Sequence, residues 1–221
     1  FSGKGKNMGV EHWIPPSEGT LRNTAWIDIF ASKTTEEVKG IFDFPKNPEA
    51  IKMMMDCAGV KNNDIIMDFF AGSGTTAKAV LERNLQNNFR NRFICIQMPE
   101  NADERSQAFK SGFNNIAEIT KERIRRVVTN ISKDSPKFDG DLGFKVFKLD
   151  SSNFKNWDPN FDTLEQDLFD AVENIKKERS QEDILYEIIL KYGLDLGVPI
   201  ESRTVNEKKI YSIGLGALII C

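Results

Sequence analysis

The stretch Ile65-Ile-Met-Asp-Phe-Phe-Ala-Gly-Ser-Gly-Thr-Thr-Ala77 decides the fold of this chain. Its apolar first half predicts a buried parallel strand over 64–70, and the Gly-Ser-Gly turn separates that strand from a helix expected over 74–86. Glycines let the backbone turn tightly and approach a ligand, because no Cβ intervenes. The start of the helix offers unpaired N–H groups, and the neighbouring serine and threonines add hydroxyls. The stretch therefore predicts a small-molecule cradle at the carboxyl end of a strand.

The flanking sequence extends this unit into an α/β fold. An apolar run predicts a second strand at 92–97, so strand, helix and strand form a βαβ unit with a parallel sheet. Upstream, a helix start is expected at 34–37, and Asn47-Pro48 opens a helix that runs to about residue 58. Downstream, apolar positions at helical spacing predict a helix over 114–131. Its basic residues are interpreted as a solvated face: Lys121, Arg123, Arg125 and Arg126.

After Pro136 the character of the sequence changes, and a smaller C-terminal α+β region is expected. It begins with a strand of alternating polarity at 144–149, followed by two acidic helical segments at 162–178 and 180–192. Two short strands are expected at 208–213 and 216–221. An apolar stripe over 184–190 suits either a core or a partner surface. The predicted organisation is therefore an irregular tail over 1–32, a cofactor-binding part over 33–136 and a C-terminal region over 137–221.

Composition sets limits on the class of protein. The chain has 221 residues and a formal net charge of −3, which neither indicates nor excludes nucleic-acid binding. Its three cysteines lack metal-type spacing, so reduced thiols in a cytoplasmic protein are expected, with no metal site. No apolar run approaches the roughly 20 residues of a membrane helix, so no membrane partner is expected. Because the chain starts at Phe1 and stops within an apparent strand, it is predicted to be part of a longer polypeptide.

Three ligands compete for the glycine turn. A phosphate-binding P-loop requires a lysine after the last glycine, where Thr75 stands here. A nicotinamide or flavin site fits the Gly-x-Gly-x-x-Ala spacing but requires an acid at the end of the next strand, which instead ends at Gln97. S-adenosylmethionine requires a carboxylate for its ammonium group, which Asp68 offers, and N–H donors for its carboxylate, which the turn offers. A simple structural turn also remains open at this point.

The order of motifs resembles the β-class amino-methyltransferases of DNA, and within them the modification subunit of type III restriction–modification systems. Residues 68–76 resemble that cofactor motif, Asp-Pro-Phe-x-Gly-Ser-Gly-Thr-Thr, with Phe69 in place of proline. Upstream, Phe42-Asp-Phe-Pro-Lys-Asn-Pro-Glu-Ala-Ile51 is similar to a second cofactor motif. Downstream, 92–100 resembles the strand that presents a polar group to ribose, and 143–157 resembles the C-terminal region of that subunit. The resemblance covers about residues 20–221.

The resemblance implies a partial Rossmann-like methyltransferase sheet that binds S-adenosyl-L-methionine. Asp68 would hold the ammonium group of the ligand, and the turn would hold its carboxylate. Phe44 and Lys46 would lie against the methionine side, and Gln97 or Glu100 would bind ribose. The cofactor-binding residues that it implies are Phe44, Lys46, Asp68, Phe70, Ala71, Gly72, Ser73, Gly74, Thr75, Thr76, Gln97 and Glu100.

The implied reaction is transfer of a methyl group to the exocyclic amine of an adenine flipped out of double-stranded DNA. In the resembled family an Asp-Pro-Pro-Tyr-type motif receives that amine. Here Asp158-Pro-Asn-Phe161 is the nearest match, but a capped turn before a helix explains it better. We therefore expect no catalytic residue in this chain, since the catalytic motif of the β class precedes the cofactor loop.

The implied partners are a second copy of the protein and a restriction subunit with helicase and nuclease activity. Two alternatives remain open from the sequence. The chain could be an NAD(P)-binding oxidoreductase fragment, or a non-catalytic piece whose residues 140–221 serve dimerisation or docking.

Overall fold

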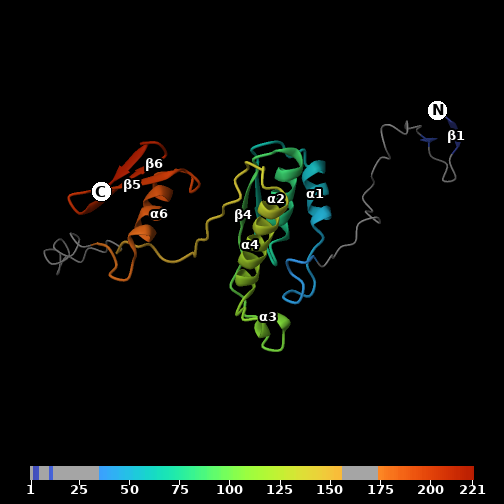
Figure 1. Cartoon of the computed structure of the whole chain (residues 1–221), viewed down its shortest axis with the longest axis horizontal. Helices are drawn as coiled ribbons and strands as arrows, with labels where there is room; N and C mark the ends of the chain where they lie inside the picture. Colours follow the sequence, from blue (N-terminus) through green and yellow to red (C-terminus); the bar gives the residue numbers. More distant parts are fainter. Residues whose placement is uncertain (1, 5–9, 12–34, 156–173) are drawn as a thin grey trace. The chain divides into compact units, whose positions relative to one another are not determined.

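The computed structural model describes residues 2–4, 10–11, 35–155 and 174–221, and it divides into two compact units, Phe1–Lys145 and Val146–Cys221. Figure 1 shows helices α1, α2 and α4 of the first unit beside β4, with the short α3 below them. Most of the expected irregular tail over 1–32 lies outside the described residues. Among the described helices, each is too short or too polar to cross a membrane.

The centre of the first unit is the predicted βαβ element. Strands β3 (Ile65–Asp68) and β4 (Arg92–Cys95) pair in parallel, with Ile65 opposite Arg92 and Asp68 opposite Cys95. Helix α2 (Thr75–Asn87) connects them. The mixed α/β class and its short parallel sheet are thus confirmed. Two further short strands, β1 (Ser2–Lys4) and β2 (Val10–Glu11), pair antiparallel near the start of the chain.

The other helices of this unit begin at side-chain caps. Helix α1 (Pro48–Cys57) starts with proline at its first position, and the Asn47 side chain accepts a hydrogen bond from the backbone N–H of Glu49. The long helix α4 (Ile116–Asp134) is capped in the same way by Asn115. A short helix, α3 (Gln107–Lys110), was not expected from the sequence.

The expected helix start at 34–37 is wrong. Residues 36–41 form turns. The N–H of Val38 donates to the carbonyl of Thr35, and the N–H of Ile41 donates to the carbonyl of Val38. Gly40 has a φ of +75°, which interrupts helical geometry. The segment is nevertheless anchored, because Val38 and Ile41 are buried.

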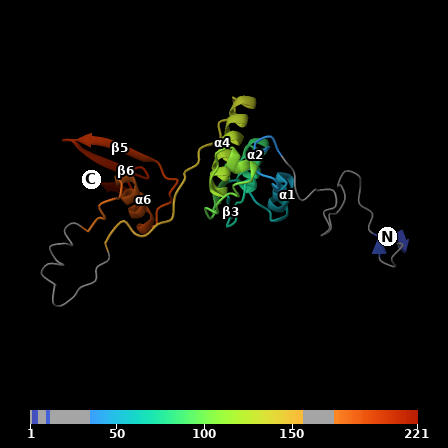
Figure 2. The same cartoon turned by 90° about the horizontal axis from the view of Figure 1, so that it is seen from below.

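One face of the β3–β4 sheet is covered by helices. Ile66 and Phe93 pack against a cluster of α1 and α2 residues that comprises Met55, Ala79 and Val80. Phe93 and Cys95 also pack against a second cluster, formed by α2 and α4: Ala77, Leu81, Ile124, Val127 and Ile131. Figure 2 shows the helices of this unit on one side of β3. Helix α2 is therefore enclosed between the sheet, α1 and α4.

The opposite face of the same sheet is apolar and uncovered by the described residues. Ile65, Met67, Ile94 and Ile96 alternate with the covered side chains, and each is 45–50% exposed. Parallel sheets are normally covered on both faces, so this exposure is unusual for a complete domain.

Helix α2 also carries charged side chains into the interior of the unit. The Lys78 ammonium lies 2.8 Å from a Glu37 carboxylate oxygen and 2.7 Å from Glu82, and Lys52 of α1 lies 2.7 Å from Glu82. The side chains of Lys78 and Glu37 are only 8% and 9% exposed. This network attaches the 36–41 turns to α2, because a buried charge requires a partner.

At its other end, α2 is joined to β4 by a reciprocal pair of asparagines. The side-chain amide of Asn84 donates to the carbonyl of Asn91, and its oxygen accepts from the backbone N–H of Asn91. Asn91 in turn accepts from the backbone N–H of Asp64, just before β3. The two asparagines thus fix where both strands begin.

The second unit packs one helix on an antiparallel sheet. Helix α6 (Gln181–Lys191) begins with a capping box formed by Ser180 and Asp183. The sheet has the order β5 (Ile200–Val205), β6 (Lys208–Ile213) and β7 (Leu218–Ile220). Strand β5 was not expected from its mostly polar sequence.

Two C-terminal expectations need correction. Residues 144–149 form no strand, and they have no ladder partner among the described residues. Residues 174–178 are not helical, and the rest of the expected helix over 162–178 lies outside the described residues. The apolar stripe of α6 lies in the core of its own unit, because Leu185 and Ile189 are buried against Ile213.

The turn between β3 and α2 presses closely on α4. Gly74, the N-cap of α2, has a φ of +79°. A Cβ at this position would lie 3.2 Å from the Thr120 methyl carbon and 3.5 Å from the Thr120 carbonyl oxygen. Glycine is required here both for its left-handed backbone and for the close approach of α4.

The buried Glu37 predicts acid sensitivity. Burial raises the pKa of Glu37, but hydrogen bonds from Lys78 and Thr35 outweigh burial and hold the pKa at about 2, below its ordinary 4.5. The stabilisation is therefore complete above pH 4.5 and is lost as pH falls toward 2. We expect Glu37→Gln to lower the free energy of unfolding at pH 7 and to flatten its decline between these values, as measured by urea unfolding. The exposed Glu36→Gln variant is the control, and an equal effect of both variants would contradict the assignment.

The contact at Gly74 predicts a steric effect beyond backbone strain. Gly74→Ala should lower the free energy of unfolding by about 1–2 kcal/mol more than Gly59→Ala, because only the first adds a crowded methyl group. Gly59 is a matched control, since its φ is +69° and its Cβ would meet nothing within 4 Å. Equal losses in urea unfolding would show that α4 does not restrict the turn.

Candidate functional site

The predicted site lies where β3 ends and α2 begins, and Asp68 is its first fixed group. One carboxylate oxygen of Asp68 accepts a hydrogen bond of 3.0 Å from the backbone N–H of Phe70, and the other accepts one of 2.5 Å from the Thr76 hydroxyl. A carboxylate has about four lone-pair positions, so each oxygen can accept a further bond. Asp68 is thus oriented by its own loop and keeps the capacity to bind a donor.

Several backbone amides of the loop are already used within the protein. The N–H of Ala71 bonds to the carbonyl of Ile96, that of Gly74 bonds to the carbonyl of Ala71, and that of Gly72 donates to the Gln97 side-chain oxygen at 2.8 Å. By contrast, the amides of Ser73, Thr75 and Thr76 have no acceptor among the residues that the structure describes. These three N–H groups remain available for an anion at the start of α2.

The rear of the loop is held by two side chains of α4. The Thr120 hydroxyl donates to the Gly72 carbonyl at 2.5 Å. The Arg123 guanidinium donates to the Ser73 hydroxyl at 2.9 Å, to the Ser73 carbonyl at 3.3 Å and to the Thr75 hydroxyl at 2.8 Å. It also reaches Thr35 at 3.3 Å. The loop is therefore attached to a helix about 50 residues further along the chain.

Arg123 corrects the sequence interpretation, which placed it on a solvated face. It is 0% exposed, whereas Arg125 is exposed. A signal for burial was present, because Ile119, Arg123 and Val127 follow one another at intervals of four and so share a helix face. The Arg123 pKa is lowered by burial, although the charges of Glu37 and Glu82 oppose this effect.

Cys95 lies at the end of β4 opposite Asp68. Burial and the nearby Asp68 carboxylate raise the pKa of Cys95 to about 12, so its thiol stays protonated at neutral pH. A nucleophilic role requires the thiolate, which is therefore absent under ordinary conditions.

The other predicted residues are distributed around the loop. The backbone carbonyl of Lys46 accepts a weak bond of 3.4 Å from the Thr75 hydroxyl, which brings the upstream motif to the loop. The Gln97 side-chain amide accepts from the amide of Gly72 and donates to the carbonyl of Met98, which leaves one donor and one acceptor position. Glu100 is exposed, and no described residue binds its carboxylate. Ala71 is buried beneath the turn.

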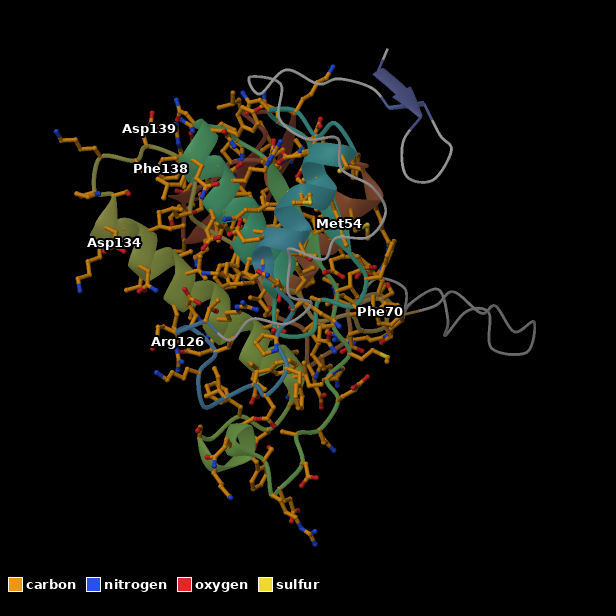
Figure 3. The ribbon with its side chains drawn as sticks, turned by 90° about the vertical axis from the view of Figure 1, so that its right-hand side faces the viewer. Met54, Phe70, Arg126, Asp134, Phe138 and Asp139 are labelled. Carbon is orange, nitrogen blue, oxygen red and sulfur yellow. The ribbon has the colours of Figure 1, made fainter. Side chains whose placement is uncertain are left out.

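Two aromatic residues of the prediction face outward. Phe44 is 81% exposed and Phe70 is 80% exposed. Figure 3 shows Phe70 on the opposite side of the view from Arg126 and Asp134 of α4. Large apolar side chains at such exposure next to a polar loop are suited to contact a ligand or another part of a protein.

Two further expectations concern chemistry outside this loop. The Asp158-Pro-Asn-Phe161 segment lies outside the described residues. Among the residues that the structure describes, no group of three or more histidine, cysteine or acidic side chains is arranged to hold a metal ion.

Comparison with known proteins gives the family of the chain. The sequence profile described as "DNA methylase", for N6 and N4 methyltransferases, matches residues 7–135, which include the loop and α4. The chain is 37% identical over 139 residues to the Mod subunit of the type III restriction-modification enzyme StyLTI of Salmonella typhimurium, and 34% identical over 156 residues to the EcoP15I Mod subunit of Escherichia coli. It is also 30% identical over 137 residues to the type II methyltransferase M.KpnI of Klebsiella pneumoniae.

These matches cover 60%, 66% and 59% of the chain but only 21%, 22% and 33% of the three relatives. The chain thus spans about a fifth of the length of the two Mod subunits. The resemblance to type III modification subunits is confirmed for this part of the sequence. Since the profile matches more than half of its residues, the chain belongs to the N6/N4 DNA methylase family.

Proposed function

We propose that this chain is the S-adenosyl-L-methionine-binding portion of a DNA adenine-N6 methyltransferase of a type III restriction–modification system. The observation that carries the proposal is the pairing of an oriented Asp68 carboxylate with three unused amides, those of Ser73, Thr75 and Thr76. An amino-acid group has an ammonium and a carboxylate at adjacent positions, so it requires an acceptor and several donors close together. The family of the chain supports a methyl donor rather than a dinucleotide.

The proposed contacts follow from the bonds that the loop leaves free. The ligand ammonium donates to Asp68, and the ligand carboxylate accepts from the amides at the start of α2, where the helix dipole favours negative charge. The exposed Phe44 and Phe70 cover the apolar parts of the ligand, and Lys46 lies near its methionine side. For the ribose, either Glu100, whose exposed carboxylate has no described partner, or Gln97, which keeps one donor and one acceptor position, can bind a hydroxyl.

Methyl transfer itself requires a group that presents the adenine amine in line with the sulfonium methyl. The described residues contain no Asp-Pro-Pro-Tyr-type motif to receive that amine. We infer that a further part of the methyltransferase domain packs on the uncovered face of Ile65, Met67, Ile94 and Ile96 and supplies the catalytic motif. The double-stranded DNA substrate, a second Mod copy and a restriction subunit would be partners of that whole protein.

An assembly role for residues 137–221 is compatible with this proposal, but the apolar stripe of α6, which suggested that role, supports it only in part. Within the stripe of α6, Leu185 and Ile189 pack against Ile213, whereas Leu190 is 59% exposed. Leu215 and Ile219 are exposed as well, by 88% and 64%. These three exposed residues are the proposed contact points.

A ligand titration tests the proposal. We expect the chain to bind S-adenosylmethionine weakly and NAD not at all by isothermal titration calorimetry. Asp68→Asn should weaken binding by roughly tenfold or more, because it removes the charge that holds the ammonium group. Asp64→Asn, just before β3, is the matched control, since the Asp64 carboxylate accepts from the backbone N–H of Lys61, away from the loop.

Tight binding of NAD with no response to S-adenosylmethionine would reject this function. An equal loss of affinity in the two aspartate variants would reject the role of Asp68 alone.

A further inference from the structure

Arg123 is an unusual residue for the interior of a protein. It is 0% exposed and forms no ion pair among the residues that the structure describes. Its partners are hydroxyl and carbonyl oxygens, and its Nε has no hydrogen-bond partner in that part of the chain. A buried cation with only neutral partners is costly, which suggests that the charge serves a purpose at the loop it contacts.

The bonds to α4 decide where the loop amides point. In a trans peptide the carbonyl of one residue and the N–H of the next point in opposite directions, and the described chain has no cis peptide. Thr120 holds the Gly72 carbonyl toward α4. The Ser73 N–H, which has no described acceptor, must therefore point away from α4.

Arg123 also fixes the polarity of the loop hydroxyls. A guanidinium has five donors and no acceptor, so the Ser73 and Thr75 hydroxyl oxygens must act as acceptors toward it. The same guanidinium nitrogen binds the Ser73 carbonyl, so the side chain and backbone of Ser73 are held together. The loop is thereby locked between α4 behind and the free amides in front.

We propose that Arg123, with Thr120, is a positioning residue for the amino-acid end of the cofactor. It does not touch the ligand. It holds the loop so that the amide of Ser73 faces the ligand carboxylate, and its positive charge is balanced across the loop by that carboxylate. This inference rests on the proposed function, because it assumes a ligand with a carboxylate at the loop.

Ligands with and without the amino-acid end separate positioning from general stability. S-adenosylmethionine and S-adenosylhomocysteine carry the carboxylate, whereas 5′-methylthioadenosine carries the nucleoside alone. We expect Arg123→Met to weaken binding of the first two by roughly tenfold or more, as loss of charge-assisted hydrogen bonds predicts, and binding of 5′-methylthioadenosine by less than about twofold. Arg123→Lys should restore part of the loss, because it keeps the charge without the fork of donors.

Two further variants complete the experiment. Each variant is made in the full chain, its ligand binding is measured by calorimetry, and its melting temperature is measured in parallel. Arg125→Met is the matched control, since Arg125 is exposed on the same helix. Thr120→Val keeps the shape of the side chain and removes the hydrogen bond to Gly72, so it provides the test if Arg123→Met does not fold. It should likewise weaken binding of the two ligands that carry a carboxylate and leave binding of 5′-methylthioadenosine nearly unchanged.

The outcomes are distinct. Equal losses for all three ligands, or unchanged affinity for S-adenosylmethionine in folded Arg123→Met and Thr120→Val, would overturn the positioning role while leaving the proposed function intact. A wild-type chain that binds none of the ligands would overturn the proposed function and this inference with it.

Discussion

The attachment of the glycine loop to α4 is the constraint on which the first unit depends. Arg123 and Thr120 bind three loop residues, Gly72, Ser73 and Thr75, from a helix far away in the sequence. Arg123 also contacts Thr35, so it joins the upstream turns to the same point. A single buried guanidinium therefore links three separate segments, and a loop that would otherwise be the most mobile part of a βαβ unit becomes one of its best-anchored parts.

The first unit is also strongly one-sided. Helices α1, α2 and α4 cover one face of the β3–β4 sheet, and the other face presents four half-exposed apolar side chains. Phe44 and Phe70 are exposed as well, so apolar side chains are uncovered beside the loop as well as on this face of the sheet. The contacts that hold the glycine loop to α4 do not involve this uncovered face.

Much of the βαβ unit could be predicted from sequence, because its signals are local. Apolar runs, the Gly-Ser-Gly turn and the Asn47 cap identified β3, β4, α1 and α2 to within a few residues. Predictions failed where tertiary contacts override local pattern. Residues 144–149 alternate like a strand but have no described partner, and polar β5 is a strand because it pairs with β6 along its whole length.

The sequence by itself determined the family of the chain and the residue pattern from which we predicted a site at Asp68 and the glycine turn. These depend on residue types at fixed short spacings. Only the tertiary structure decided which amides remain free, that Gln97 binds Gly72, and that Arg123 lies inside the protein. The physical reason is that hydrogen-bond satisfaction and burial depend on neighbours brought together by folding, and in this chain those neighbours lie 25 to 88 residues apart.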